Sequence, residues 1–202
     1  MEVNNKLPLV AIVGPTASGK SALAIEIAKK FNGEIICADS RTIYKYMDIG
    51  TAKPDLNDRQ QIPHWGLDII EPGERYSAAD FKVYAAQKIA EIRSRGHIPL
   101  LVGGTGLYVD SVIFDYQFGS KADPKLRNQL QNMTIPQLQE YCKNNNIKLP
   151  KNSLNARHLI RAIETKDAPT RLSTSIIDNC IVVGITTEKS VILDRIRGRI
   201  LQ

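Results

Sequence analysis

The sequence predicts an α/β fold in which a parallel β-sheet lies between two layers of helices. Short, mostly apolar runs at 9–13 and 98–102 indicate buried strands, and the runs at 34–38 and 181–185 indicate two further strands. Segments with helical periodicity separate these runs. Strands that alternate with helices in this way favour a parallel sheet over an antiparallel one.

The first strand leads into a glycine-rich loop at 14–21, and a helical pattern follows at 22–30. The loop has the form G-x-x-x-x-G-K-S, and a strand before it with a helix after it is the context of a phosphate-binding loop. The expected architecture is therefore P-loop NTPase-like, with three layers. The predicted phosphate-binding residues are Gly14, Pro15, Thr16, Ala17, Ser18, Gly19, Lys20 and Ser21.

The residues of this loop suit an anion. Backbone N–H groups and the positive end of the helix dipole attract negative charge. Lys20 adds a full positive charge, and the hydroxyl of Ser21 can hold a Mg²⁺ ion that bridges phosphate oxygens. The loop alone leaves open which phosphate compound binds.

The second strand is expected to deliver residues 39–42 to the carboxyl edge of the sheet, where open α/β folds bind ligands. Asp39 is therefore expected near the phosphate loop. Aspartate also caps turns readily, so a purely structural role for Asp39 is the equal alternative.

Residues 44–75 show few regular patterns, and we expect an ordered loop region with a short strand near 67–70. His64, beside Trp65, favours packing over chemistry. A long helix is then predicted to run to about residue 95, with a capping box at its start formed by Ser77 and Asp80.

The strand at 98–102 ends in Gly-Gly-Thr-Gly at 103–106. An ATP-hydrolysing P-loop protein would usually place an acidic residue there to hold Mg²⁺. The glycines instead favour a close approach of the backbone to a ligand, with a tight turn as the alternative.

Helical segments rich in Asn, Gln and Lys are predicted at 124–131, 135–144 and 155–166. We expect them to form a small helical insert at 120–168, between a core at 1–119 and a return to that core at 169–202. Three basic side chains of the last segment fall within about one helical turn, which indicates either a solvated face or a binding surface: Arg157, His158 and Arg161.

Composition is typical of a globular protein, with 43% hydrophobic and 24% charged residues in 202. We expect no membrane span and no signal peptide, and the scattered Cys37, Cys142 and Cys180 indicate a reduced, cytoplasmic protein. A net charge of +6 only modestly favours a nucleic-acid partner. Because the chain stops inside a basic helix that begins near Glu188, we expect more chain to follow normally.

Taken together, the motifs resemble the tRNA dimethylallyltransferase family (tRNA isopentenyltransferases). Such enzymes move a dimethylallyl group from its diphosphate to the exocyclic amine of the adenine beside the anticodon, on its 3′ side. The matching segments are collinear and cover nearly the whole chain: 14–21, 38–40, 44–54, 76–81, 102–108, 122–124 and 159–164.

The resemblance implies that the phosphate loop holds dimethylallyl diphosphate, with Mg²⁺ on Ser21, and that Asp39, Lys20 and Thr105 act in catalysis. Asp39 would accept a proton from the amine. The enzyme is expected to act as a monomer on the anticodon stem-loop of tRNA. The implied tRNA contacts are Asp39, Ser40, Arg41, Thr42, Thr105, Arg127, Arg157, His158, Leu159, Ile160 and Arg161.

The sequence also departs from the family pattern. Relatives usually continue for about a further third of their length, their insert is longer, and a second His often stands where Trp65 follows His64. Three alternatives stay open: an adenylate isopentenyltransferase, a small-molecule kinase with the same loop, and a shortened, inactive tRNA-binding relative.

Overall fold

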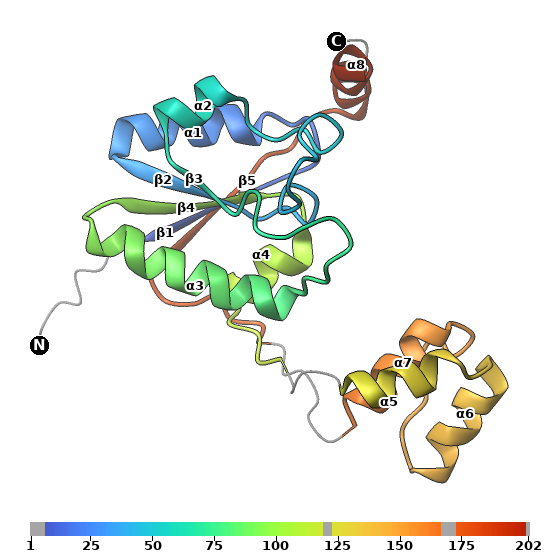
Figure 1. The fold of residues 1–202 in the computed structure, drawn as a ribbon. Helices are drawn as coiled ribbons and strands as arrows, with labels where there is room; N and C mark the ends of the chain where they lie inside the picture. Colours follow the sequence, from blue (N-terminus) through green and yellow to red (C-terminus); the bar gives the residue numbers. More distant parts are fainter. Residues whose placement is uncertain (1–6, 119–122, 167–172, 201–202) are drawn as a thin grey trace, which may run out of the picture. The chain divides into compact units, whose positions relative to one another are not determined.

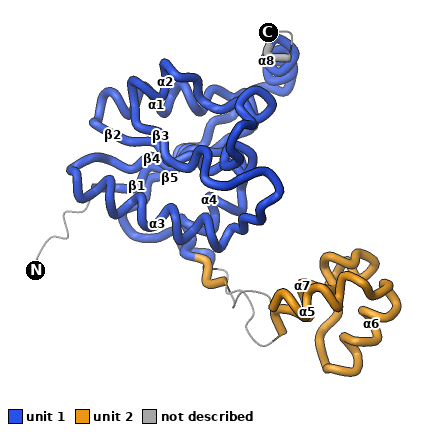
Figure 2. Tube along the Cα trace, in the orientation of Figure 1, with its two compact units in different colours: residues 1–115, 173–202 blue, residues 116–172 orange. Residues whose placement is uncertain are grey.

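The computed structural model describes residues 7–118, 123–166 and 173–200. The chain divides into two compact units, a core formed by residues 1–115 and 173–202 and a helical unit formed by residues 116–172 (Figure 2). The helical unit thus begins and ends within a few residues of the insert expected at 120–168.

The core contains a five-stranded parallel sheet, which confirms the predicted α/β fold (Figure 1). The strand order is β3-β2-β4-β1-β5, so the strand before the phosphate loop lies between two partners that come much later in the sequence. The strands are β1 (Leu9–Val13), β2 (Gly33–Cys37), β3 (His64–Trp65), β4 (Ile98–Gly103) and β5 (Cys180–Gly184).

The short strand expected at 67–70 was wrong in position, because the strand lies at His64–Trp65. Gly66 and Asp68 have left-handed backbone (φ 86° and 55°), which interrupts the extended chain directly after the strand. Ile70 makes only an isolated bridge to Tyr44.

Helices cover both faces of the sheet. One face carries α1 (Lys20–Phe31) and α2 (Leu56–Gln61), and the other carries α3 (Ala78–Ser94) and α4 (Gly106–Ile113) (Figure 1). The last helix, α8 (Lys189–Ile200), follows β5. The capping box predicted at the start of α3 is present, whereas α2 was not predicted, because it is short and buries none of its residues.

Apolar side chains fill both spaces between sheet and helices. Ala24 and Ala28 of α1 pack against strand residues such as Ile12 and Leu100, and on the opposite face the rings of Phe81 and Tyr108 stack at 4.4 Å. Because the strands are parallel and in register, β1, β2 and β4 all end at one edge of the sheet. The segments that follow these strands are therefore held close together on a rigid base.

A buried carboxylate lies at the opposite end of β2. The side chain of Glu34 is 3% exposed and accepts two hydrogen bonds from the guanidinium of Arg95, at 2.9 and 2.8 Å. It also accepts one from Nε1 of Trp65 at 2.7 Å and contacts Nδ1 of His97 at 2.7 Å. Burial by itself raises the pKa of Glu34, but the hydrogen bonds from Arg95, Trp65 and His97 outweigh it and leave the pKa below its usual value.

Replacing Glu34 with glutamine is expected to lower the free energy of unfolding by about 2 kcal/mol at pH 7, because the charge-assisted hydrogen bonds from Arg95 are lost while Arg95, which is 41% exposed, stays partly solvated. A lowered pKa means that the carboxylate stabilises the fold above its unfolded-state pKa, and that this stability is lost as pH falls below about 4. Urea unfolding across pH should therefore show the gap between the two proteins narrowing in acid. Glu26→Gln, on the exposed face of α1, is the matched control, and an equal loss in that variant would contradict the prediction.

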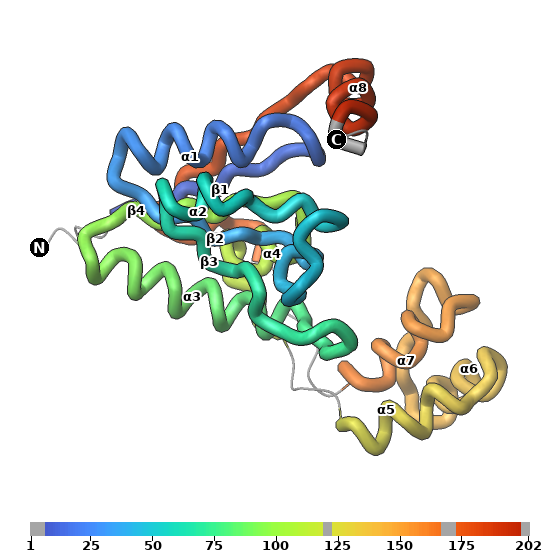
Figure 3. Tube along the Cα trace, turned by 45° about the horizontal axis from the view of Figure 1, so that its top comes forward, coloured from blue at the N-terminus to red at the C-terminus, as the bar shows by residue number. Residues whose placement is uncertain are grey.

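The helical unit contains α5 (Pro124–Gln131), α6 (Ile135–Asn144) and α7 (Ala156–Glu164), which pack as a small bundle (Figure 3). Asp123 caps α5, and Thr134 with Gln137 forms a capping box on α6. The unit has a core of its own: Leu130, Leu138, Cys142, Leu159, Ile160 and Ile163. Across the described part of the chain, none of the helices combines the length and the apolarity that a membrane crossing requires.

Candidate active site

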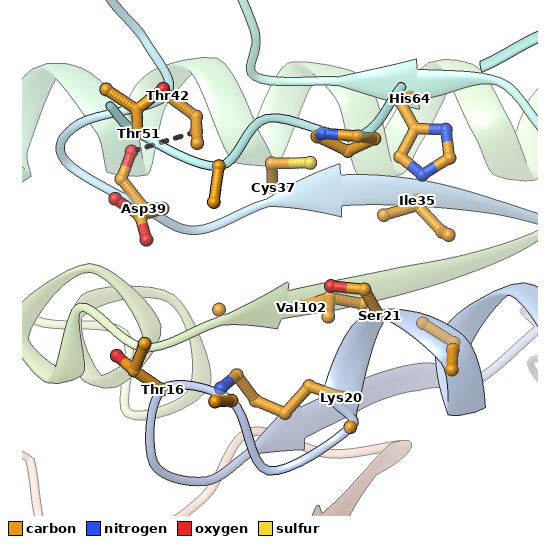
Figure 4. Close-up of a pocket in the computed structure, with 18 of the residues that line it drawn as sticks. Thr16, Lys20, Ser21, Ile35, Cys37, Asp39, Thr42, Thr51, His64 and Val102 are labelled. Atoms are coloured by element: carbon orange, nitrogen blue, oxygen red, sulfur yellow. Dashed lines mark hydrogen bonds between the residues drawn. The ribbon is translucent and has the colours of Figure 1, made fainter. Parts of the chain in front are cut away.

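A pocket of about 570 Å³ lies at the edge of the sheet where β1, β2 and β4 end (Figure 4). Its walls come from the phosphate loop and α1, from the end of β2, from residues 51–54, from the end of β4 and from α8. Among the predicted site residues, those that line it are Thr16, Ala17, Gly19, Lys20, Ser21, Asp39 and Thr42.

Hydrogen bonds to its own backbone hold the phosphate loop in a closed turn. Nζ of Lys20 donates to the carbonyl of Pro15 at 2.5 Å, and the N–H of Ser18 donates to the same carbonyl at 3.3 Å. Ala17 and Gly19 have left-handed backbone (φ 63° and 97°), which turns the chain sharply before α1 begins. The loop therefore presents its backbone and Lys20 at the positive end of a helix, as an anion site requires.

Three predicted residues of the loop support this shape without lining the pocket, namely Gly14, Pro15 and Ser18. The side chain of Ser18 is buried, and its hydroxyl has no hydrogen-bond partner among the described residues. Ser21 follows Lys20 in the first turn of α1 and faces the pocket (Figure 4).

Asp39 lies across the pocket from the phosphate loop (Figure 4). Its Oδ1 accepts a hydrogen bond from the N–H of Arg41 at 2.8 Å, so this oxygen stabilises the turn that follows β2. Both roles left open by the sequence are thus compatible with the geometry, because one carboxylate oxygen serves the turn while the side chain lines the pocket. Thr42 is buried beside it, with its hydroxyl 3.4 Å from the carbonyl of Asp39.

Thr105 is hydrogen-bonded to Ser40 rather than to Asp39. Its Oγ1 accepts from the N–H of Ser40 at 3.0 Å and donates to Oγ of Ser40 at 3.3 Å, while its own N–H donates to the carbonyl of Ala38 at 3.3 Å. Thr105 thereby fixes the end of β4 to the segment that carries Asp39.

Gly103 and Gly104, at the end of β4, have different surroundings. A side chain at Gly103 would lie 2.1 Å from the carbonyl oxygen of Ala38, so this glycine allows the segment after β2 to approach closely. Gly103 also lines the pocket. Gly104 lines the pocket and has open space around it, so a ligand could approach its backbone.

One wall of the pocket is apolar. It is formed by Ala24, Ile35, Cys37 and Val102, with His64 beside them (Figure 4). Burial raises the pKa of the Cys37 thiol to about 12, so the thiol is neutral at pH 7. Burial also lowers the pKa of His64, whose Nδ1 lies 2.8 Å from the carbonyl of Ile62. His64 is therefore a neutral wall residue that packs and also lines the pocket.

Several lining residues were not identified from the sequence. Thr51, Ala52 and Pro54 belong to a loop that shows no regular pattern. Arg195 comes from α8, and its Nη1 donates to the carbonyl of Ala17 at 3.1 Å. The arginine-rich character of the last helix was its only signal, and that signal does not tell which arginine reaches the phosphate loop.

The remaining predicted residues belong to the helical unit. The side chain of Glu164 is 1% exposed and pairs with Arg127 at 3.2 Å and with Arg161 at 3.8 Å. Leu159 and Ile160 lie in the core of the unit, where their side chains pack against other apolar residues. Of the predicted nucleic-acid contacts, these two side chains are therefore not exposed to a ligand. The exposed basic side chains of α7 are Arg157, His158 and Arg161.

Comparison with known proteins gives a consistent result. The model of the family described as "IPP transferase" matches residues 42–202. A tRNA dimethylallyltransferase of Acetivibrio thermocellus is 41% identical over 209 residues, which cover 95% of this chain and 66% of the relative. A tRNA dimethylallyltransferase of Streptococcus pyogenes serotype M2 is 40% identical, with 96% and 66% covered.

Solved structures agree with this. The full-length tRNA isopentenylpyrophosphate transferase of Bacillus halodurans is 40% identical with a TM-score of 0.67, covering 98% of this chain and 66% of its own. A eukaryotic dimethylallyltransferase acting on tRNA shares the fold, with a TM-score of 0.75 at 24% identity over 96% of this chain and 53% of its own. The chain thus spans about two thirds of the length of the first curated relatives it matches.

Proposed function

Since this chain belongs to the IPP transferase family, we propose that it transfers a dimethylallyl group from dimethylallyl diphosphate to tRNA. The acceptor is the exocyclic amine of the adenine on the 3′ side of the anticodon. One observation carries this proposal: a single pocket has a phosphate loop with Lys20 and Arg195 on one side and one carboxylate, Asp39, on the other.

The cationic side of the pocket suits the leaving group. When the allylic C–O bond breaks, negative charge grows on the diphosphate, and the loop N–H groups, Lys20 and Arg195 stabilise it. The neighbouring wall of Ala24, Ile35 and Val102 offers an apolar surface to the hydrocarbon part of the substrate.

The carboxylate side suits the acceptor. As the amine nitrogen attacks the allylic carbon and the new C–N bond forms, the nitrogen becomes acidic and must lose a proton. Oδ1 of Asp39 is bonded to the N–H of Arg41, so the other oxygen, Oδ2, is the one assigned to accept that proton. Thr105, through Ser40, holds this segment in place.

A Mg²⁺ ion fits the residues present. The hydroxyl of Ser21 is a hard oxygen donor in the pocket, but the described residues contain no group of three or more His, Cys, Asp or Glu side chains that could hold a metal. Mg²⁺ is commonly held by few protein ligands together with phosphate oxygens and water, which agrees with a site completed by the diphosphate. When bound, the ion would offset the charge of the leaving diphosphate.

The helical unit is proposed to hold the tRNA. Arg157, His158 and Arg161 face solvent on α7, and Arg127 on α5 shares Glu164 with Arg161. Phosphate contacts from these side chains would offset the cost, a few kcal/mol, of turning the adenine out of its stack. We further propose that the protein acts as a monomer in the cytoplasm, in keeping with its three free cysteines.

The direct test is incubation with labelled dimethylallyl diphosphate and unmodified tRNA, with AMP and ATP in parallel reactions. We expect label in tRNA and not in AMP. Label in AMP would indicate an adenylate isopentenyltransferase, and ATP consumption without prenyl transfer would indicate a kinase. Binding of both ligands without transfer would show that this chain is an inactive relative, and any of these three results overturns the proposal.

A further inference from the structure

An exposed apolar tip stands on the loop between β2 and α2. Three of its side chains are large and apolar and lie largely in solvent: Tyr46 is 79% exposed, Met47 45% and Ile49 98%. Such side chains gathered in one short segment are a recurrent mark of an interaction site. We refer to these three residues as the loop tip.

The loop that carries the tip is ordered, because hydrogen bonds from one buried lysine hold both ends of the loop. The side chain of Lys53 is 1% exposed, and its Nζ donates to the carbonyl of Tyr44 at 2.6 Å and to the carboxylates of Asp48 and Asp68, both at 2.7 Å. Within the loop, the N–H of Ala52 donates to the carbonyl of Ile49 at 3.1 Å. The exposure of the tip is therefore built into an ordered loop.

Two non-glycine residues of the loop have a left-handed backbone conformation, which residues other than glycine rarely adopt. Tyr46 has φ 62° and Ala52 has φ 51°. Left-handed backbone at such residues has an energetic cost, and it persists where the surrounding contacts enforce it, often at functional sites. The bonds of Lys53 on either side supply that enforcement.

The same loop forms part of the pocket wall. Thr51, Ala52 and Pro54 line the pocket, and Thr51 lies beside Thr42 and Asp39 on its carboxylate side (Figure 4). Only a few residues of the chain thus separate the loop tip from the residues that line the side of the pocket at which the adenine is proposed to enter.

Charge at the loop tip does not oppose a polyanion as the partner. Asp48 is the acidic residue of the segment 44–54, and its carboxylate is bonded to Lys53. This hydrogen bond holds the pKa of Asp48 below its usual value. The ion pair compensates its negative charge, so the tip offers apolar surface without an unpaired carboxylate that would repel phosphates.

We propose that the loop tip is a contact surface for unpaired RNA bases that flank the adenine entering the pocket. Tyr46 offers a ring on which a base can stack, and Met47 and Ile49 offer apolar surface to neighbouring bases. This inference rests on the proposed function. It assigns to the core, in addition to the helical unit, a part in reading the single-stranded loop.

The test compares binding of two labelled RNAs by fluorescence anisotropy: a hairpin whose unpaired loop contains adenines, and a fully paired duplex of equal length. Tyr46→Ala is expected to weaken hairpin binding about tenfold and to leave duplex binding unchanged, because the duplex has no base free to stack. Ile49→Ser should show a smaller loss with the same selectivity. Phe31→Ala and Val83→Ser are matched controls, since they remove exposed apolar side chains at the far end of α1 and on α3.

Lys53→Met tests the base of the loop. Amide hydrogen exchange in 46–52 should become faster and hairpin affinity should fall, although the tip side chains are unchanged. The inference is overturned if the tip variants bind the hairpin as tightly as the wild-type protein does, or if hairpin binding and duplex binding weaken equally. If the unchanged protein binds inorganic diphosphate but no hairpin, the tRNA proposal itself fails, and the loop inference fails with it.

Discussion

Asp39→Ala is expected to lower the rate of dimethylallyl transfer by about a thousandfold, the middle of the range for loss of a general base. Affinity for inorganic diphosphate should change by less than about twofold, because Asp39 lies across the pocket from the phosphate loop. Single-turnover transfer and calorimetric titration with diphosphate measure the two quantities separately.

Asparagine at this position separates the two roles of the side chain. Asp39→Asn can still accept the hydrogen bond from the N–H of Arg41, so the turn should survive, yet it cannot take up a proton. The two variants should therefore lose transfer to a similar extent, and Asp39→Asn should unfold at the temperature of the unchanged protein. If Asp39→Asn retained most of its transfer rate, the carboxylate would be a turn residue and the assignment as base would be wrong.

Lys20→Ala is expected to weaken the binding of inorganic diphosphate by about tenfold to 150-fold. A hydrogen bond to a charged group is worth about 1.5–3 kcal/mol, and Lys20 lies in the pocket at the start of α1. Calorimetric titration at several salt concentrations measures this loss, and the salt dependence of binding should become shallower in the variant.

The matched control for this variant lies on the same helix. Lys29→Ala removes one exposed positive charge in the last turn of α1, far from the phosphate loop, so net charge changes equally in both proteins. An equal loss of affinity in the two variants would mean that overall charge, and not a local contact of Lys20, governs diphosphate binding.

The sequence predicts those parts of the fold that depend on local pattern. The apolar strands, the G-x-x-x-x-G-K-S loop and the capping box at Ser77 each lie within one segment, and the structure agrees with all three. Helices α5 and α6 have the bounds predicted for them. For α7 the pattern extends slightly beyond the helix, which is usual at helix ends.

The parts that the sequence did not predict depend on contacts between distant segments. The need for glycine at position 103 comes from the carbonyl of Ala38, which directly follows the distant strand β2. Arg195 reaches the phosphate loop only because α8 folds back to Ala17. The buried position of Lys53 likewise follows from Asp68, which lies beyond α2 and β3. No local pattern contains these partners.

The place of β1 in the sheet has a consequence for how the protein emerges from the ribosome. β1 is made first, but its neighbours β4 and β5 begin at residues 98 and 180. At roughly 5–20 residues per second, the strand before the phosphate loop waits on the order of ten seconds for its last partner. During that interval its apolar edge is unprotected, so slow translation or a stalled ribosome should expose the nascent chain to aggregation and to chaperones.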